Sequence, residues 1–167
     1  ELYAAECEGR AARLPSLPVS YSDFSEWHRD WMKGAVLDRQ VAYWRERLHG
    51  APESLQLPAD KPRPAMQSGD GGTVWVHVPP APIARLREVS QAESGTMFMA
   101  LLTLWALVLH RQTGQREVVI GTPVRGRNQP ETEKVMGFFV NAIPLRITVP
   151  SEGGFLDALR DVRRQVV

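Results

Sequence analysis

Apolar and aromatic residues recur every three or four positions between Tyr21 and Leu48. They are Phe24, Trp27, Trp31, Leu37, Val41, Trp44 and Leu48. This spacing puts them on one face of a helix with 3.6 residues per turn, so it predicts an amphipathic helix over residues 21–48. Gly34 lies inside the pattern and is a candidate break in that helix.

The next periodic segments follow a glycine-rich turn signal at residues 68–72. Residues 73–78 are rich in β-branched and aromatic side chains, which predicts a strand. After two prolines, apolar residues at helical spacing predict a helix over residues 83–92. Ser94, Gly95 and Thr96 should end that helix and cap a second one over residues 97–112.

The segment 97–112 is apolar on nearly all sides. A helix without a polar face is normally buried in a layered core, so we expect other elements to cover both of its sides. Its longest apolar stretch, residues 97–109, contains Thr103 and is shorter than the about 20 residues that span a bilayer. No secretory signal pattern opens the chain, and we therefore expect a cytoplasmic protein without a membrane partner.

The covering sheet is predicted in the following segments. Residues 117–124 and 138–149 are strand-like, residues 126–130 form a loop, and residues 131–136 form a short helix. Residues 153–167 again show helical spacing and end on an unfinished pattern, while residue 1 already lies in a helical pattern. We expect the chain to be an internal fragment of an α/β protein.

Charge balance and cysteine content narrow the possible partners and the cellular compartment. The chain has 167 residues, with 20 Lys and Arg against 19 Asp and Glu, and a formal net charge of +1. This balance gives no electrostatic reason to expect a nucleic-acid partner. The single cysteine, Cys7, cannot form an internal disulfide, which agrees with a reducing compartment.

No catalytic or metal-binding set emerges from residue spacing. The four histidines are scattered, and none has a second histidine or a cysteine at metal-ligand spacing; they are His28, His49, His77 and His110. We therefore predict no metal site and no catalytic residue in this chain. The glycines at 69–72 precede a predicted strand and lack a following Lys, so they are a turn and not a phosphate loop.

Two segments are unusual for generic structure. In residues 120–128 a predicted strand contains Gly121, which permits close approach, and Pro123, which cannot donate to a ladder. In residues 136–146 one amide, Asn141, lies within an otherwise apolar strand. A buried Asn must satisfy its hydrogen bonds, so Asn141 either faces a wet site or has buried polar partners. Without any function, residues 120–128 would be an ordinary strand end, and Asn141 would have a local turn or strand-edge role. Both alternatives remain open.

Taken in order, these segments resemble the motifs of condensation domains of nonribosomal peptide synthetases. Residues 21–27 match the Tyr-x-Asp-(Phe/Tyr)-x-x-Trp motif, and residues 43–48 resemble the end of the helix that follows it. Residues 57–64, Leu-Pro-Ala-Asp-Lys-Pro-Arg-Pro, resemble the connector between lobes. Residues 121–127 and 137–141, the latter Gly-Phe-Phe-Val-Asn closing at Arg146, resemble motifs of the second lobe. The resemblance covers the whole chain with no motif out of order.

The resemblance implies a fold like that of chloramphenicol acetyltransferase, with two α/β lobes in a V and a tunnel between them. Residues 1–56 would be the C-terminal part of the first lobe, residues 57–68 the connector, and residues 69–167 a truncated second lobe. By position, it implies that the lobe interface and tunnel wall contain four substrate-binding residues, Gly121, Thr122, Asn141 and Arg146. It also implies that Tyr21, Asp23 and Trp27 brace the first lobe.

The implied activity is amide formation. Donor and acceptor arrive as thioesters on the phosphopantetheine arms of upstream and downstream peptidyl carrier domains, next to an adenylation domain, and no cofactor is bound directly. The family's His-His-x-x-x-Asp-Gly motif, whose second His positions or deprotonates the amine, is absent here. We therefore expect an acyltransferase as the parent domain and no activity in this fragment alone.

Two other functions remain open. An epimerization domain resembles the same fold but exchanges a proton at Cα, and its counterpart of residues 137–141 usually differs. A non-catalytic carrier-docking scaffold would also lack the histidines. The joined amino acids, the donor's stereochemistry and the final peptide are not encoded in a short motif.

Overall fold

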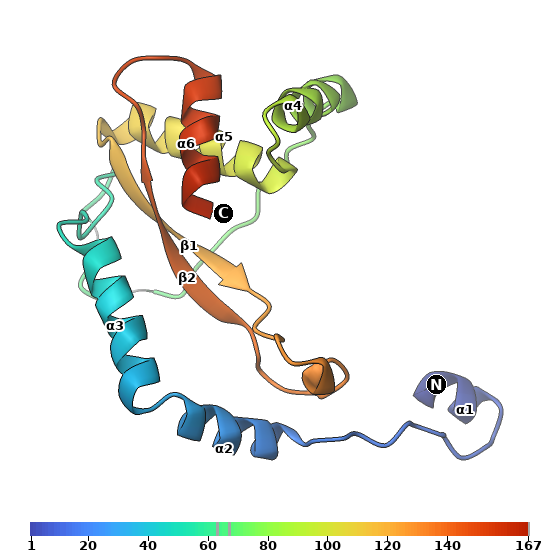
Figure 1. Cartoon of the computed structure of the whole chain (residues 1–167). Helices are drawn as coiled ribbons and strands as arrows, with labels where there is room; N and C mark the ends of the chain where they lie inside the picture. Colours follow the sequence, from blue (N-terminus) through green and yellow to red (C-terminus); the bar gives the residue numbers. More distant parts are fainter. Residues whose placement is uncertain (63, 67, 167) are drawn as a thin grey trace. The chain divides into compact units, whose positions relative to one another are not determined.

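The computed structural model describes residues 1–62, 64–66 and 68–166. Arg63 and Gln67, both in the predicted connector, and Val167 lie outside the described residues. The helices are α1 (Leu2–Cys7), α2 (Tyr21–Trp31), α3 (Gly34–Leu48), α4 (Pro80–Ala92), α5 (Met97–Thr113) and α6 (Phe155–Val166), with a 3-10 turn η1 (Pro130–Thr132). The strands are β1 (Glu117–Val124) and β2 (Asn141–Thr148), as Figure 1 shows.

The chain divides into two compact units. Unit 1 comprises Glu1–Glu46 and Pro123–Ile143, and unit 2 comprises Arg47–Thr122 and Pro144–Val167. Each unit therefore contains residues from both sides of the predicted connector. The assignment of residues 1–56 and 69–167 to separate lobes stays a prediction.

The predicted helix over residues 21–48 is confirmed, in two pieces. The Ser20 hydroxyl accepts a hydrogen bond from the Asp23 N–H, and the Asp23 carboxylate accepts one from the Ser20 N–H, which together form a capping box for α2. α2 ends at Trp31 and α3 begins at Gly34, whose φ of +51° is a conformation that glycine adopts without a steric penalty. The break thus falls at the predicted glycine.

The two helices predicted after the connector are also confirmed. α4 begins earlier than expected, with Pro80 in its first turn, where the missing N–H of proline leaves no bond unmade. The Thr96 hydroxyl accepts from the Met99 N–H at 3.3 Å and caps α5. Gly114, with φ of +73°, ends α5 in the left-handed conformation common after helices.

Unit 2 has a continuous apolar core centred on one face of α5. α5 packs against α4 and α6, and residues of both strands and of the segment after β2 complete the cluster. The buried members are Met99, Ala100, Leu102, Ala106, Leu109, Val118, Ile147, Val149, Leu159 and Val162. Burial of these side chains drives the folding of this unit, since each fully buried aliphatic side chain contributes about 1.5–3 kcal/mol.

The strands β1 and β2 form a two-stranded antiparallel sheet (Figure 1). Beside the start of β1, the Val149 N–H donates to the Arg116 carbonyl at 2.7 Å, which extends the pairing past the end of β2. β1 has the predicted bounds. β2 begins later than predicted, because residues 138–140 lie outside the ladder, and the short helix predicted over 131–136 is reduced to the single turn η1.

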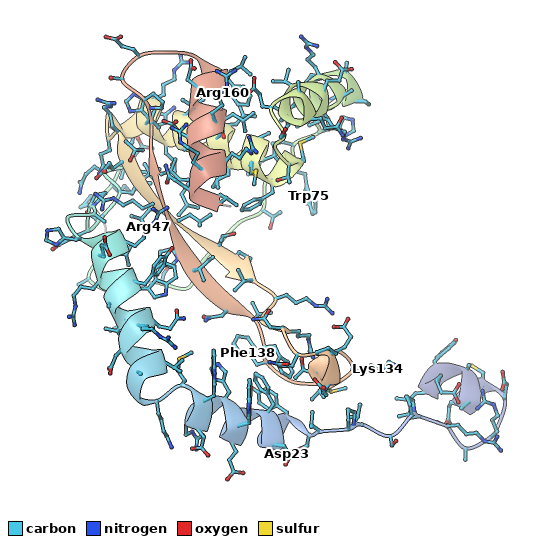
Figure 2. All side chains as sticks on the ribbon, viewed as in Figure 1. Asp23, Arg47, Trp75, Lys134, Phe138 and Arg160 are labelled. Carbon is cyan, nitrogen blue, oxygen red and sulfur yellow. The ribbon has the colours of Figure 1, made fainter. Side chains whose placement is uncertain are left out.

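The strand predicted over residues 73–78 is wrong. The structure assigns no strand there, and the Trp75 side chain, labelled in Figure 2, is 92% exposed. A strand needs a hydrogen-bonded neighbour as well as suitable side chains, and no described segment pairs with this one. β-Branched and aromatic residues indicate that the segment favours an extended conformation, but they do not show whether another strand pairs with it.

The expectation that both sides of α5 are covered is also wrong for this chain. Its second side carries large apolar residues that are 39–53% exposed, here called the outer stripe: Phe98, Leu101, Leu104, Trp105 and Val108. Among the described residues, no helix alone has the length and hydropathy to cross a bilayer. α4 and α5 reach those values only as a pair, and they are bent by 107°.

We expect the isolated chain to self-associate, because the outer stripe exposes contiguous apolar surface to water. Replacing Leu101 and Trp105 together with Gln should reduce the association measured by sedimentation velocity over a concentration series. The control is Gln112→Ala, which alters an exposed polar residue of the same helix and should change nothing. A concentration-independent monomer with a sharp, reversible thermal transition would contradict the expectation.

Candidate functional site

Three of the segments that carry the family resemblance meet in unit 1. They are the start of α2, the loop after β1 and the residues just before β2. Their common centre is Phe139, whose side chain is only 6% exposed although it lies in a segment without regular secondary structure. The position of this segment therefore depends on side-chain contacts and not on a backbone ladder.

Aromatic rings of α2 enclose one side of Phe139. The Phe24 ring centroid lies 4.7 Å away, and the Tyr21 ring meets Phe139 edge-to-face at 5.2 Å. The Arg127 guanidinium lies 4.0 Å from the Phe139 ring centroid in a cation–π contact. Edge-to-face aromatic pairs and cation–π contacts each contribute about 0.5–1.5 kcal/mol beyond burial, so Phe139 joins the helix to the loop.

Tyr21 also fixes the backbone before β2. Its hydroxyl donates to the Phe138 carbonyl at 2.9 Å. Its ring lies so close to Gly137 that a Cβ added there would lie 2.2 Å from the nearest ring atom. Only glycine allows this approach, which gives Gly137 of the Gly-Phe-Phe-Val-Asn segment a steric reason.

The loop after β1 closes on the same segment from its other side. Gly126 has φ of +67°, and a Cβ there would lie 2.0 Å from the Phe139 carbonyl oxygen, so both conformation and space require glycine. The Arg127 guanidinium donates to the carbonyls of Val135, at 2.8 Å, and Thr132. One arginine therefore holds the loop in shape and contacts Phe139.

The start of α2 is stabilised electrostatically. Hydrogen bonds from the Ser20 N–H and then from the Ser20 hydroxyl hold the pKa of Asp23 below its usual value. A carboxylate with a lowered pKa in the folded state adds stability above its unfolded pKa and loses it as the pH falls through the folded value. At neutral pH Asp23 is ionised and the capping box is intact.

Two open grooves flank Trp27 in unit 1. One is lined by Val19, Asp23, Phe24, Trp27, Gln129, Glu131 and Thr132. The other is lined by Phe24, Trp27, His28, Trp31, Gly126, Asn128 and Gln129. The Trp27 and Trp31 rings stack with their planes 7° apart and their centroids at 5.8 Å. Trp27 therefore forms part of both groove walls.

The four predicted substrate-binding residues are spread over both units. Asn141 belongs to unit 1, and Gly121, Thr122 and Arg146 belong to unit 2. In the described part of the chain, no side-chain hydrogen bond or ion pair joins these last three. Gly121 is exposed, and a Cβ added there would meet no atom of the described residues within 4 Å. Thr122 is half-buried.

Asn141 is exposed among the described residues. Its side-chain oxygen accepts a hydrogen bond from the N–H of the next residue, Ala142, at 2.8 Å. This local bond closes a turn-like contact at the first residue of β2. The amide NH₂ makes no hydrogen bond to the described residues and is available to a ligand.

Arg146 links three backbone segments within unit 2. Its guanidinium donates to the Glu117 carboxylate of β1 at 2.9 and 3.0 Å. It also donates to the carbonyls of His49, at 2.7 Å, and Arg47, at 3.3 Å, at the end of α3. A cation suits the carbonyl end of a helix, so Arg146 has a structural role here in addition to any contact with substrate.

The histidines do not assemble into a catalytic or metal-binding group. His28 stacks on Phe24, and the His110 Nδ1 lies 3.0 Å from the Gln115 carbonyl oxygen. Over residues 1–62, 64–66 and 68–166, no three His, Cys, Asp or Glu side chains come together in a way that could hold a metal ion. The motif segments that meet at Phe139 offer aromatic rings and a guanidinium for binding.

Sequence reasoning does not find the centre of this site. In the sequence, Phe139 and Arg127 are recognised only as members of two motifs. Tyr21 is predicted only to support the first lobe. The contacts that define their roles join α2 to residues more than 100 positions later. The one local signal is glycine at 126 and 137, since glycine lets other groups approach the backbone closely.

Comparison with known proteins gives consistent matches over the whole chain. The family profile described as "Condensation domain" matches residues 1–167. The chain is 41% identical over 167 residues to malpinin synthetase of Mortierella alpina, covering 100% of this chain and 2% of that protein. It is 40% identical over 166 residues to phosphinothricin tripeptide synthetase PhsC of Streptomyces viridochromogenes, covering 99% of this chain and 15% of the other.

Solved structures agree. The X-domain from teicoplanin biosynthesis matches with a TM-score of 0.87 and 27% identity, over 98% of this chain and 38% of that one. The first condensation domain of the CDA synthetase matches with a TM-score of 0.75 and 25% identity, over 99% and 36%. These matches confirm the predicted α/β fold. The chain spans a small part of the curated relatives and little more than a third of these two structures.

Gly137→Ala should destabilise the protein by about 1–3 kcal/mol, because the added methyl group would overlap the Tyr21 ring and force the segment before β2 to move. Gly121→Ala is the matched control: its methyl group meets open space, and we expect a change within about 0.5 kcal/mol. Urea unfolding followed by tryptophan fluorescence at high dilution, where self-association is low, measures both. Equal effects of the two substitutions would contradict the packing described here.

Proposed function

Because the chain belongs to the condensation-domain family, we propose that it is part of a nonribosomal peptide synthetase domain that forms amide bonds between carrier-bound aminoacyl or peptidyl thioesters. The observation that carries the proposal is the family match over residues 1–167, together with the synthetases found among its relatives. The convergence of three motif segments on Phe139 supports it. No observation favours an epimerization domain or a non-catalytic scaffold.

The proposed reaction is an acyl transfer. The amine of the acceptor attacks the thioester carbonyl of the donor, a C–N bond forms, the C–S bond breaks, and the donor thiol leaves. The base that positions or deprotonates the amine would be a histidine of the His-His-x-x-x-Asp-Gly motif, and no adjacent histidine pair exists in these 167 residues. The residues of this chain would bind and orient the reactants.

The partners in this proposal are carrier domains on either side and an adenylation domain in the same synthetase. Substrates would arrive on the phosphopantetheine arms of the carriers, and the protein would act in the cytoplasm. We further propose that Gly121, Thr122, Asn141 and Arg146 lie along the passage that these arms enter. The exposed amide of Asn141 supports this role best, since its NH₂ is free to donate to a pantetheine or substrate carbonyl.

The isolated chain should form no amide product above background from donor-loaded and acceptor-loaded carriers, whereas the longer protein that contains it should form product. Mass spectrometry of the carrier-bound products measures both. Product from the isolated chain would contradict the assignment of the catalytic base to another segment. Absence of product from the longer protein with every loaded pair would contradict the proposed function itself.

Asn141→Ala separates a binding role from a structural one. The substitution removes a side chain whose one hydrogen bond inside the chain is local, so the thermal midpoint of the longer protein should change little. Loss of a contact worth about 1 kcal/mol should slow single-turnover amide formation about fivefold. A lowered midpoint with an unchanged rate would refute the binding role.

A further inference from the structure

One of the two grooves beside Trp27 combines an aromatic wall with two carboxylates, and it is here called the acidic groove. It lies within unit 1 and has a volume of about 370 Å³. Phe24 and Trp27 of α2 form its aromatic wall, and Trp27 is 44% exposed. Asp23 of α2 and Glu131 of η1 add the carboxylates. Aromatic rings beside carboxylates suit a cation on an apolar stem, such as the side chain of Lys or Arg.

Neither carboxylate of the acidic groove is fully used by the described residues. Both hydrogen bonds that Asp23 accepts from Ser20 reach one oxygen, Oδ2, so Oδ1 has no hydrogen bond there. These bonds from the Ser20 N–H and hydroxyl lower the pKa of Asp23, which is therefore ionised at neutral pH. In the described part of the chain, Glu131 makes no hydrogen bond or ion pair, unlike its neighbour Glu133.

The basic residues nearest in sequence to Glu131 do not neutralise the acidic groove. Arg125 pairs with Glu133 at 2.5 Å, and the Arg127 guanidinium lies over the Phe139 ring. Lys134, which Figure 2 labels, forms no ion pair with the described residues. The acidic groove therefore keeps its negative charge in a chain whose formal net charge is +1, and it is complementary to a cation from elsewhere.

The contacts that the acidic groove offers are individually weak. A cation over one aromatic ring and ion pairs at exposed carboxylates do not hold a free peptide at micromolar concentration. A segment of the same polypeptide has an effective concentration in the millimolar range, so it can occupy such a site without further contacts. The chain spans a small part of its curated relatives, whose remaining length includes many candidate segments.

We propose that the acidic groove is a docking site for an arginine side chain from a segment of the same polypeptide outside these 167 residues. A planar guanidinium stacks on an aromatic ring and presents several N–H donors in a fixed fork, whereas the ammonium of Lys is a compact, strongly hydrated charge. The guanidinium would lie against Trp27 and donate to Asp23 Oδ1 and to the Glu131 carboxylate. This docking concerns the assembly of the protein and does not depend on the proposed amide-forming reaction.

The experiment uses the longer protein that contains this chain. Gln129 lines the acidic groove and is exposed, and its replacement by the photo-crosslinking amino acid p-benzoylphenylalanine keeps both carboxylates. After illumination, mass spectrometry identifies the peptide that is captured. Glu152, exposed in the loop after β2, receives the same replacement as a control. A series of protein concentrations separates capture within one molecule from capture between molecules.

We expect the crosslinker at Gln129 to capture a segment outside residues 1–167, beside an arginine, with a yield that does not depend on protein concentration. Adding Glu131→Arg should lower this yield about fivefold, because repulsion replaces attraction, and Glu131→Gln should lower it less. Glu152→Gln, the matched control, should leave the yield unchanged. Replacing the identified arginine with Glu should restore part of the yield in the Glu131→Arg protein, because the charges are then reversed.

Each other outcome overturns a stated part of the proposal. Capture confined to residues 1–167, or of a segment without an arginine beside the captured residue, overturns the arginine occupant. A yield that rises with protein concentration shows a contact between molecules and overturns the tethered one. An unchanged yield with Glu131→Arg overturns the role of the carboxylate; if that variant fails to fold, as its thermal midpoint would show, Glu131→Gln gives the same test. Failure to form amide while capture and rescue succeed affects the proposed function alone.

Discussion

Burial of the Phe139 ring is the contact on which unit 1 depends. The segment that contains it lies outside the sheet, so its place is determined by what surrounds the ring: two aromatic side chains from α2 and one guanidinium from the loop after β1. The glycines at 126 and 137 follow from the same contact, since each lies where a side chain would strike Phe139 or Tyr21. The contacts around a single buried ring thus account for Tyr21, Phe24, Arg127 and the two glycines, which come from three separated motifs.

The helices and β1 could be predicted from the sequence because their signals are local. Apolar spacing, the capping residues Ser20 and Thr96, and glycine at 34 and 114 all act within a few residues of the element they define. The strand expected over residues 73–78 was wrong because a strand also depends on a hydrogen-bonded partner, which local composition does not reveal. The late start of β2 has a similar cause, since Phe139 packs against side chains before the ladder begins.

The site was only partly predictable. Motif order identified the family and pointed to Asn141, yet the sequence could not decide between burial and exposure of that residue, because apolar neighbours in sequence do not guarantee burial. The bonds from Arg146 to Glu117 and to the end of α3 span 29 to 99 positions and leave no periodic trace. The apolar core of unit 2 was easier to predict, because the buried residues of α5 and α6 follow the helical pattern of the sequence.

The hydrogen bond from Tyr21 to the Phe138 carbonyl joins residues 117 positions apart. Any exchange of sequence between related synthetases with a crossover between these two residues would combine a tyrosine ring from one parent with a glycine and an aromatic pair from another. Tyr21, Gly137 and Arg127 are packed against one another through Phe139, so these residues have to be exchanged together. Engineers who recombine such domains have a structural reason to transfer residues 21–141 as one block.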